Sequence, residues 1–231
     1  MKVRTYLPLV LVILLNITQV KAQQNDWENP QLVDVGKEKT RVAFMLFNKV
    51  QDAIADEYTT STNYKSLNGT WKFNYVDQYK DRRMDFYKTT LDDSGWANLK
   101  VPSNWELNGF GIPIYTNITY PHPKNPPFIG PDNPVGTYRK TFTVPENWDE
   151  KVVMLHFGSI SGCAFIYVNG IKVGMTKASK TPAEFNITKH LKRGQNLLAV
   201  EVFRWHDGSY LEDQDFWRLS GIERNVYLTA M

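Results

Sequence analysis

Hydrophobic and polar positions alternate over much of the chain from residue 66 onward, and this period of two is the pattern of half-buried β-strands. In the stretch SLNGTWKFNYV, the rings of Trp71, Phe73 and Tyr75 alternate with lysine and asparagine. The stretch GTYRKTFTVP places Phe142 on the apolar face and Arg139 on the polar face of a second strand. Further apolar or alternating runs predict strands within residues 151–158, 163–168, 196–205 and 224–230.

Turn and helix signals complete an all-β pattern. Asn169 and Gly170 separate two apolar runs, and because a type I′ turn needs positive φ at both central residues, this pair predicts a tight hairpin. Helix is scarce: residues 92–96 and 186–194 suggest a turn or two each, with Gly194 as the stop of the second. Many short strands with few helices predict a β-sandwich of the jelly-roll type over residues 66–231.

Two segments depart from the strand pattern. Residues 23–65 are polar with weak periodicity, and we interpret them as an extended N-terminal arm laid over the sandwich. Residues 117–136 hold six Pro, which lack backbone donors, so this segment predicts a long loop. Long ordered loops in compact domains are often functional.

The first 22 residues have the features of a secretory signal peptide. Lys2 and Arg4 form a basic start, residues 6–15 form an apolar run, and Ala22 ends a plausible cleavage motif. The run is short for a membrane span and no later run replaces it, with an uncleaved anchor as the alternative. We therefore expect an exported protein, periplasmic or secreted, without a membrane span after cleavage.

The net charge and the cysteine content exclude some classes of partner and of covalent cross-link. Removal of residues 1–22 takes away three of the 27 Lys and Arg and none of the 24 Asp and Glu, so the mature chain carries no net charge. With no block of like charges, the sequence predicts no nucleic-acid partner. Cys163 is the single cysteine, which excludes an internal disulfide, and we expect it to behave as a small buried apolar residue.

The strongest candidate chemistry lies in the stretch RWHDGSYLEDQDFWRLSGIERNVYL, which sets acids among aromatic residues. Such a stretch suits a sugar site, and it also suits an acidic loop on a sandwich. Glycoside hydrolysis needs two carboxyl groups flanking the scissile bond. Glu212 and Asp213 are adjacent and diverge in an extended chain, whereas Asp213 and Asp215 would approach a sugar from the same side. The sequence therefore favours binding over autonomous catalysis.

Other residues of this stretch have structural interpretations. His206 and Asp207 suggest a dyad, but neighbours in an extended segment diverge, so we expect a solvated pair. We interpret Trp217 and Arg218 as structural, the indole through its buried area and the guanidinium by tying loop to strand. The other histidines show no metal-ligand spacing.

Several motifs, in order from Asp26 to Leu228, resemble the N-terminal sugar-binding domain of glycoside hydrolase family 2 β-galactosidases. They are DWENP, SLNGTWKF, VPSNWELNGFGIPIYTNITYP, NPPF, DNPVGTYRKTF and GSYLEDQDFWRLSGIERNVYL. The resemblance implies a galactose-binding-domain-like jelly roll. It also implies that Asn117 hydrogen-bonds the galactosyl group, and that Asp215 binds galactose hydroxyls and ligates a monovalent cation, usually sodium. The alternatives are an Asx-turn for Asn117, and a turn cap or an ion pair with Arg218 for Asp215.

In that family an immunoglobulin-like domain follows, and then a (β/α)₈ barrel that carries both catalytic Glu residues, the remaining cation ligands and the magnesium site. The chain therefore looks like the first domain of a β-galactosidase-like O-glycosidase, with no catalytic residues of its own and its status as an enzyme open. Expected partners are a β-galactoside and the downstream domains, and full-length members often form homo-oligomers. The alternatives are a free-standing, non-catalytic carbohydrate-binding module and a non-functional truncation product.

Overall fold

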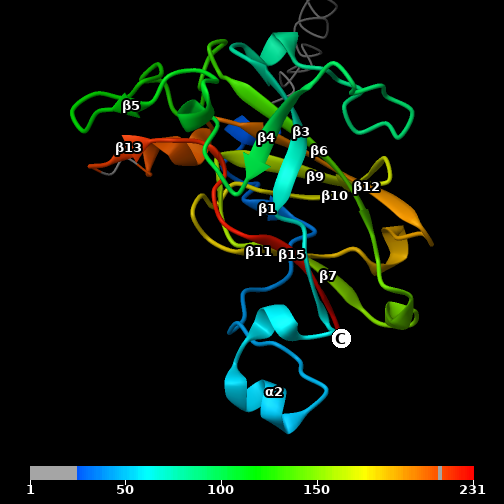
Figure 1. Cartoon of the computed structure of the whole chain (residues 1–231). Helices are drawn as coiled ribbons and strands as arrows, with labels where there is room; N and C mark the ends of the chain where they lie inside the picture. Colours follow the sequence, from blue (N-terminus) through cyan, green and yellow to red (C-terminus); the bar gives the residue numbers. More distant parts are fainter. Residues whose placement is uncertain (1–24, 213–214) are drawn as a thin grey trace, which may run out of the picture.

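Two antiparallel sheets face each other in this computed structural model, which describes residues 25–212 and 215–231 (Figure 1). They form a β-sandwich, which confirms the predicted all-β class. Within the described ranges the larger sheet has seven strands, in the order β1 (Asp34–Val35), β10 (Ile171–Thr176), β9 (Cys163–Val168), β12 (Gln195–Phe203), β6 (Val135–Thr143), β3 (Gly69–Val76) and β4 (Ala97–Val101). The smaller sheet has four described strands, in the order β11 (Ala183–Asn186), β7 (Val153–Phe157), β15 (Val226–Ala230) and β2 (Tyr64–Ser66).

Short ribbons and helical turns complete the described chain. One ribbon pairs β5 (Ile114–Tyr115) with β13 (Trp217–Arg218), and the other pairs β8 (Ile160–Ser161) with β14 (Gly221–Ile222). The helical elements are α2 (Val50–Ala55) and the 3₁₀ turns η1 (Asp26–Glu28), η2 (Tyr58–Thr60), η3 (Tyr79–Asp81), η4 (Glu106–Asn108), η5 (Glu146–Trp148), η6 (Thr188–His190) and η7 (Asp207–Tyr210). None of the helices in residues 25–212 and 215–231 has the length and hydropathy needed to cross a membrane.

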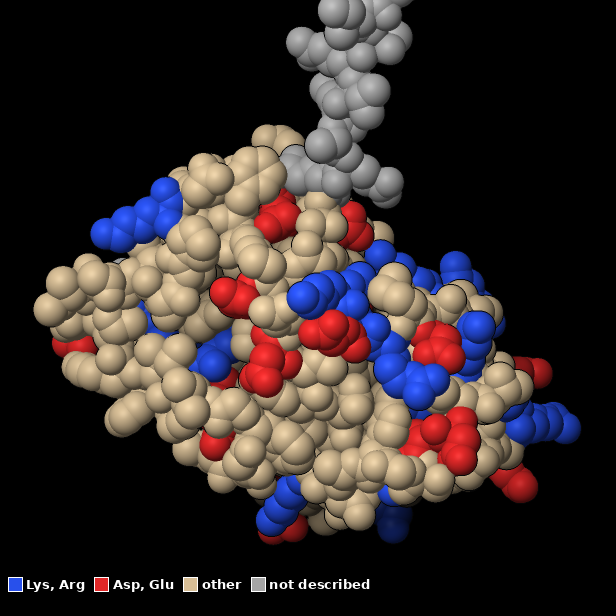
Figure 2. Space-filling model, turned by 90° about the horizontal axis from the view of Figure 1, so that it is seen from above, with Lys and Arg blue, Asp and Glu red and all other residues tan. Residues whose placement is uncertain are grey.

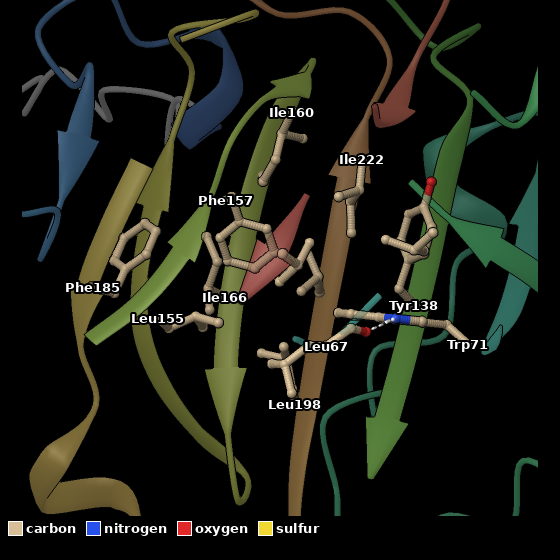
Figure 3. Packing of buried hydrophobic residues seen from close by; sticks show 14 of the residues in the cluster. Leu67, Trp71, Tyr138, Leu155, Phe157, Ile160, Ile166, Phe185, Leu198 and Ile222 are labelled. Carbon is tan, nitrogen blue, oxygen red and sulfur yellow. Dashed lines mark hydrogen bonds between the residues drawn. The ribbon is translucent and has the colours of Figure 1, made fainter. Parts of the chain in front are cut away.

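The predicted strands are all present, and their apolar sides meet between the two sheets (Figure 3). Trp71 and Tyr138 come from the larger sheet, while Leu155 and Phe157 come from the smaller one, and all four are buried. The Trp71 indole donates to the Leu67 carbonyl at 2.9 Å, so its one polar atom is satisfied inside the core. Alternation in the sequence thus identified the inner face of the sandwich correctly.

The hairpin between β9 and β10 has the predicted geometry. Asn169 and Gly170 have φ of 51° and 87°, as the type I′ turn requires. The Asn169 side chain stabilises the turn further, because its amide donates to the His190 carbonyl at 2.8 Å and its oxygen accepts from the Leu197 N–H at 2.9 Å.

The outer face of the seven-stranded sheet is covered as well, which alternation did not predict. Arg139 points to this face and is only 4% exposed. Its guanidinium donates to Asp93 at 2.6 Å and to the Phe86 carbonyl, both from the segment that follows β3. Trp27 of the arm covers the same face and stacks on Phe203, with ring centroids 4.1 Å apart. Cys163, on this face, is buried as expected.

The arm lies partly on the sandwich and partly away from it. Its strand β1 pairs with β10, and farther along Arg41 contacts Glu184 of β11 at 2.9 Å. Helix α2 buries none of its residues and projects from the body (Figure 1). The last residues of the arm form β2 of the smaller sheet. Residues 1–22, interpreted as a signal peptide, lie outside the described residues.

The Pro-rich segment is a long loop up to residue 134, and its final two residues begin β6. Tyr210 holds this loop in place, because its hydroxyl donates to the Phe128 carbonyl at 2.7 Å and accepts from the Asn125 N–H at 3.2 Å. The loop is therefore ordered against η7.

Gly136 of β6 provides a test of the packing beneath this loop. A Cβ at this position would lie 2.4 Å from the Trp105 ring and 2.9 Å from the Phe73 ring, both in the core. We expect Gly136→Ala to lower the free energy of unfolding by about 1–3 kcal/mol through overpacking. The matched control is Gly95→Ala, where a Cβ would meet nothing within 4 Å. Urea denaturation should show a change of less than about 0.5 kcal/mol for the control; equal changes in both variants would contradict the packing argument.

Candidate functional site

A ribbon outside both main sheets brings the two candidate sugar-binding residues together. Strands β5 and β13 are antiparallel, with Tyr115 opposite Trp217. Asn117 follows Tyr115 by two residues and Asp215 precedes Trp217 by two, so both lie in the bends that flank the same end of the ribbon. Because directly opposite residues of an antiparallel pair project to the same side, Tyr115 and Trp217 share one face of the ribbon. Asn117 and Asp215 are both exposed.

Tyr115 holds the Asp215 carboxylate. Its hydroxyl donates to Asp215 Oδ1, a diagonal contact across the ribbon. This hydrogen bond raises the pKa of Tyr115, because the neighbouring carboxylate disfavours a phenolate. The ring of Tyr115 also lies 5.6 Å from that of Trp217, measured between centroids.

Trp217 is 54% exposed, so the prediction that it buries a large area is wrong. The indole stands on the open face of the ribbon, beside Tyr115. Its exposure follows from the alternation of β13, since Trp217 projects to the open face whereas Arg218 projects to the opposite, buried face.

Arg218 anchors the ribbon from that buried face, as predicted. Its guanidinium donates to the Glu212 carbonyl and to the Thr116 carbonyl, each at 3.0 Å. The Arg218 carbonyl in turn accepts from Arg204 at 2.8 Å, and Arg204 directly follows β12. These bonds fix both strands of the ribbon to the larger sheet through main-chain atoms.

His206 occupies a buried network, so the expected solvated pair with Asp207 is wrong. The imidazole is 1% exposed, with Nδ1 3.6 Å from Asp207 Oδ1 and Nε2 3.4 Å from Glu212 Oε2. Burial opposes the imidazolium, but the two carboxylates outweigh it and raise the pKa of His206. Lys177 joins the network 2.9 Å from Asp207, and it donates to the Asn29 carbonyl at 2.8 Å. The network therefore ties the arm to the loop that precedes β13.

The local backbone explains why the extended-chain argument failed here. Residues 207–210 form η7, and His206 is its N-cap. The Gly208 N–H lies 3.1 Å from the imidazole Nδ1, which accepts from it when the ring is neutral, while the Ser209 hydroxyl accepts from the His206 N–H at 3.0 Å. This capping box turns the chain back, so the side chain of Asp207 returns toward the imidazole.

Asp207 and Glu212 are engaged in structural contacts. Glu212 accepts from the Ser179 N–H at 3.2 Å and faces His206. Burial alone would raise the pKa of Glu212, but its contacts with His206 and Ser179 outweigh burial and lower it. Asp213 lies outside the described residues. In the part of the chain that the structure describes, no three His, Cys, Asp or Glu side chains gather into a metal-binding group.

Sequence reasoning missed two features of the site. Tyr115 carried a usable signal, because it precedes Asn117 by two residues and so shares its face in an extended strand. A hollow of about 290 Å³ beside the ribbon gave no signal in the sequence, because the residues that border it, Lys180, Arg204 and Phe216, come from separate segments. The Lys180 ammonium lies 5.1 Å from the centre of the Phe216 ring.

The surface around the ribbon is poor in charge and rich in exposed apolar side chains. In Figure 2 the lobe on the left, the side of β5 and β13 in Figure 1, is largely tan, whereas both charge signs mix on the right. The exposed apolar residues here are Leu107, Ile112, Tyr115, Ile118 and Trp217. Large exposed apolar patches on soluble proteins commonly mark interaction sites.

Comparison with known proteins gives one consistent family. Residues 64–231 match the family described as "Glycosyl hydrolases family 2, sugar binding domain". A β-galactosidase of Priestia megaterium is 40% identical over 209 residues, which are 88% of this chain and 20% of that protein. A β-galactosidase of Pectobacterium atrosepticum is 42% identical, over 89% of this chain and 19% of that protein. The chain thus spans about a fifth of the length of the curated relatives it matches.

Solved structures agree with these matches. Bacteroides uniformis β-glucuronidase 2 is 30% identical, with a TM-score of 0.56 over 72% of this chain and 18% of its own. A β-glucuronidase from an uncultured Clostridium species is 28% identical, with a TM-score of 0.54 over 73% of this chain and 29% of its own.

The buried His206 network makes stability depend on pH with a definite sign. Because the pKa of His206 is raised in the folded state, its contribution is fully present below its unfolded value, about 6.5, and is lost as the pH rises through the folded pKa. We expect His206→Gln to cost on the order of 1–3 kcal/mol at low pH, since Asp207 and Glu212 lose their positively charged partner, and less as the pH rises. The measurement is urea unfolding of both proteins between about pH 5.5 and 8.5.

The control for this prediction is His190→Gln. Burial lowers the pKa of His190, so its removal should not produce a stability loss that shrinks with rising pH. A stability difference for His206→Gln that is constant, or that grows with pH, would refute the assigned charge state.

Proposed function

The chain belongs to glycosyl hydrolase family 2, as the N-terminal sugar-binding domain, and from this premise we propose that it forms the galactoside-binding wall of a β-galactosidase-like O-glycosidase. Galactose is favoured over glucuronic acid because the curated β-galactosidases are 40–42% identical to this chain, against 28–30% for the two solved β-glucuronidases described above. The catalytic carboxyl groups would come from a downstream barrel.

The observation that carries the proposal is the register of the β5–β13 ribbon. It brings the segments that carry Asn117 and Asp215 side by side, and a hydrogen bond from Tyr115 orients the Asp215 carboxylate, which supports the proposal. A carboxylate accepts hydrogen bonds from sugar hydroxyls, and an amide both donates and accepts, so the pair can read hydroxyl orientation. The exposed rings of Tyr115 and Trp217 beside them supply the apolar surface that a sugar ring prefers.

The proposed role for Asp215 is binding rather than acid–base catalysis. The neighbouring acid Glu212 is turned away into the His206 network, so it does not serve as the second carboxyl that glycoside hydrolysis needs. A single wall also cannot enclose a sugar, since binding sites normally bury most of the ligand surface. The apolar surface around the ribbon suits an approaching domain that completes the enclosure.

Asp215 would also supply one ligand to a sodium site shared with the downstream barrel. Its exposed carboxylate is a hard oxygen donor, which suits such a cation, and only one of its oxygens is engaged by Tyr115. The described residues contain no metal-binding group of three or more side chains, so they fit a contribution of one ligand rather than a whole site. Magnesium would be held by the barrel alone.

We further propose that the chain is exported, to the periplasm or the medium, on the strength of its first 22 residues. Export would place the sugar-binding wall where extracellular galactosides are available. Host, plant and milk galactosides all satisfy this chemistry.

An exchange experiment tests the proposal. The matching segment of the Priestia megaterium β-galactosidase, which is 40% identical, is replaced by residues 25–231 of this chain. We expect the hybrid to hydrolyse an aryl β-galactoside, and Asp215→Asn to lower kcat/KM at least tenfold, about 1.4 kcal/mol of transition-state stabilisation. The control is Asp149→Asn, an exposed carboxylate paired only with exposed Arg193. A hybrid that is active but indifferent to Asp215→Asn would remove this residue from the site.

The isolated chain provides a second, independent test. We expect no turnover of an aryl β-galactoside, and binding of galactose no tighter than about 1 mM, because the wall offers few polar contacts and no enclosure. Enzyme assay and calorimetric titration are the measurements. Turnover that disappears in Asp215→Asn would assign catalysis to this chain, whereas tight binding that depends on Asp215 would instead favour a free-standing carbohydrate-binding module.

A further inference from the structure

A hollow of about 540 Å³ lies on the outer face of the seven-stranded sheet and shares no lining residue with the β5–β13 ribbon. The arm forms one wall through Trp27, the segment after β3 forms another through Phe86 and Tyr87, and Glu201 of β12 lies between them. We infer that this hollow is a second carbohydrate-binding site, which holds one or two sugar units by their hydroxyl groups and ring faces.

Glu201 is the first observation that points to a ligand. Its side chain is 8% exposed, and its closest cation is Arg82, with Nε 3.4 Å from Oε1. Neither Arg82 Nε nor Glu201 Oε1 has a hydrogen-bond partner among the described residues. A buried carboxylate oxygen without a donor costs on the order of 1–3 kcal/mol, and a native structure that keeps one calls for an explanation. Oε1 itself is enclosed and faces Arg82, but the Glu201 side chain lines the hollow, where a ligand hydroxyl can donate to the carboxylate.

The register of β12 places Glu201 on the outer face of the larger sheet. Glu201 faces Phe165 of β9 across the outer face, in the middle of the sheet. Burial raises the pKa of Glu201 to about 7, against the opposing effect of Arg82 and Lys172. Holding a carboxylate at this position is therefore energetically unfavourable, and a Thr or Val would fit the strand pattern equally well.

Donors and a second acceptor surround this carboxylate. Arg82 lies with its guanidinium carbon 5.5 Å from the Trp27 ring and 5.4 Å from the Phe203 ring, which holds it at the edge of the hollow. Lys172 lies 4.8 Å over the Phe165 ring and 3.5 Å from Asp26 Oδ2. Two cations and two acidic side chains thus line one cavity, and this mixture of donors and acceptors favours a ligand that both donates and accepts hydrogen bonds.

Aromatic rings form the remaining wall. Tyr87 and Tyr167 are stacked with centroids 4.8 Å apart and an interplanar angle of 11°, and Phe86 meets Tyr167 edge-on at 5.2 Å. Both tyrosines are only half-buried, so ring surface remains available to a ligand. Charged groups that hydrogen-bond hydroxyls, set beside rigid aromatic surface, are the combination that a sugar requires. The volume of the hollow also falls within the usual range for small-molecule sites.

Titration of the full chain with galactose, lactose, glucose and xylose, followed by heteronuclear NMR, tests this inference. We expect at least one sugar to shift the backbone amides of Tyr87, Tyr167 and Lys172 with a saturating dependence in the millimolar range, about 4 kcal/mol. Glu201→Gln should weaken that binding at least about tenfold, because it removes one acceptor while conserving shape. Lys172→Met, which conserves the stem over Phe165, should weaken it as well.

Controls separate this site from the ribbon. Asp215→Asn should leave the shifts of Tyr87 and Tyr167 unchanged, so that failure of one site leaves the other open to test. The far-ultraviolet circular dichroism of each variant verifies folding. Absence of saturating shifts at these residues up to about 100 mM of every sugar, or shifts that Glu201→Gln leaves intact, would overturn the inference and leave Glu201 and Arg82 as a purely structural ion pair.

Discussion

Burial of the seven-stranded sheet on both faces is the constraint on which the rest of the structure depends. The four-stranded sheet covers the inner face, and the arm with the segment after β3 covers the outer face. An antiparallel sheet commonly leaves one face to water, so outward-facing polar residues here must find partners inside the protein. Arg139 finds them in Asp93 and a carbonyl group, whereas Glu201 keeps one oxygen without a hydrogen bond.

The same constraint separates what the sequence could predict from what it could not. Alternation located the strands and the inner core, because a period of two is a local property of the chain. The Asn169–Gly170 turn was predictable for the same reason, since its φ angles depend on two adjacent residues. The cover over Arg139 was not predictable from the pattern, because it comes from a segment about 50 residues earlier in the sequence.

The candidate site shows a similar division. The family resemblance selected Asn117 and Asp215, and in the structure they follow and precede the two strands of one short ribbon. Adjacency in the sequence misled the interpretation of His206, because η7 reverses the chain where an extended segment was assumed. Trp217 was misjudged for a related reason: its size suggested burial, but its exposure is decided by the open face of β13 to which it projects.

The β5–β13 ribbon belongs to neither main sheet, and this separation has a consequence for how such a domain changes over evolutionary time. The sandwich holds most of the buried apolar area, while the ribbon is attached to it through bonds from Arg204 and Arg218 to main-chain carbonyls. Bonds to main-chain atoms do not depend on the side chains displayed on the open face. Residues on that face can therefore diverge while the scaffold that presents them stays equally stable.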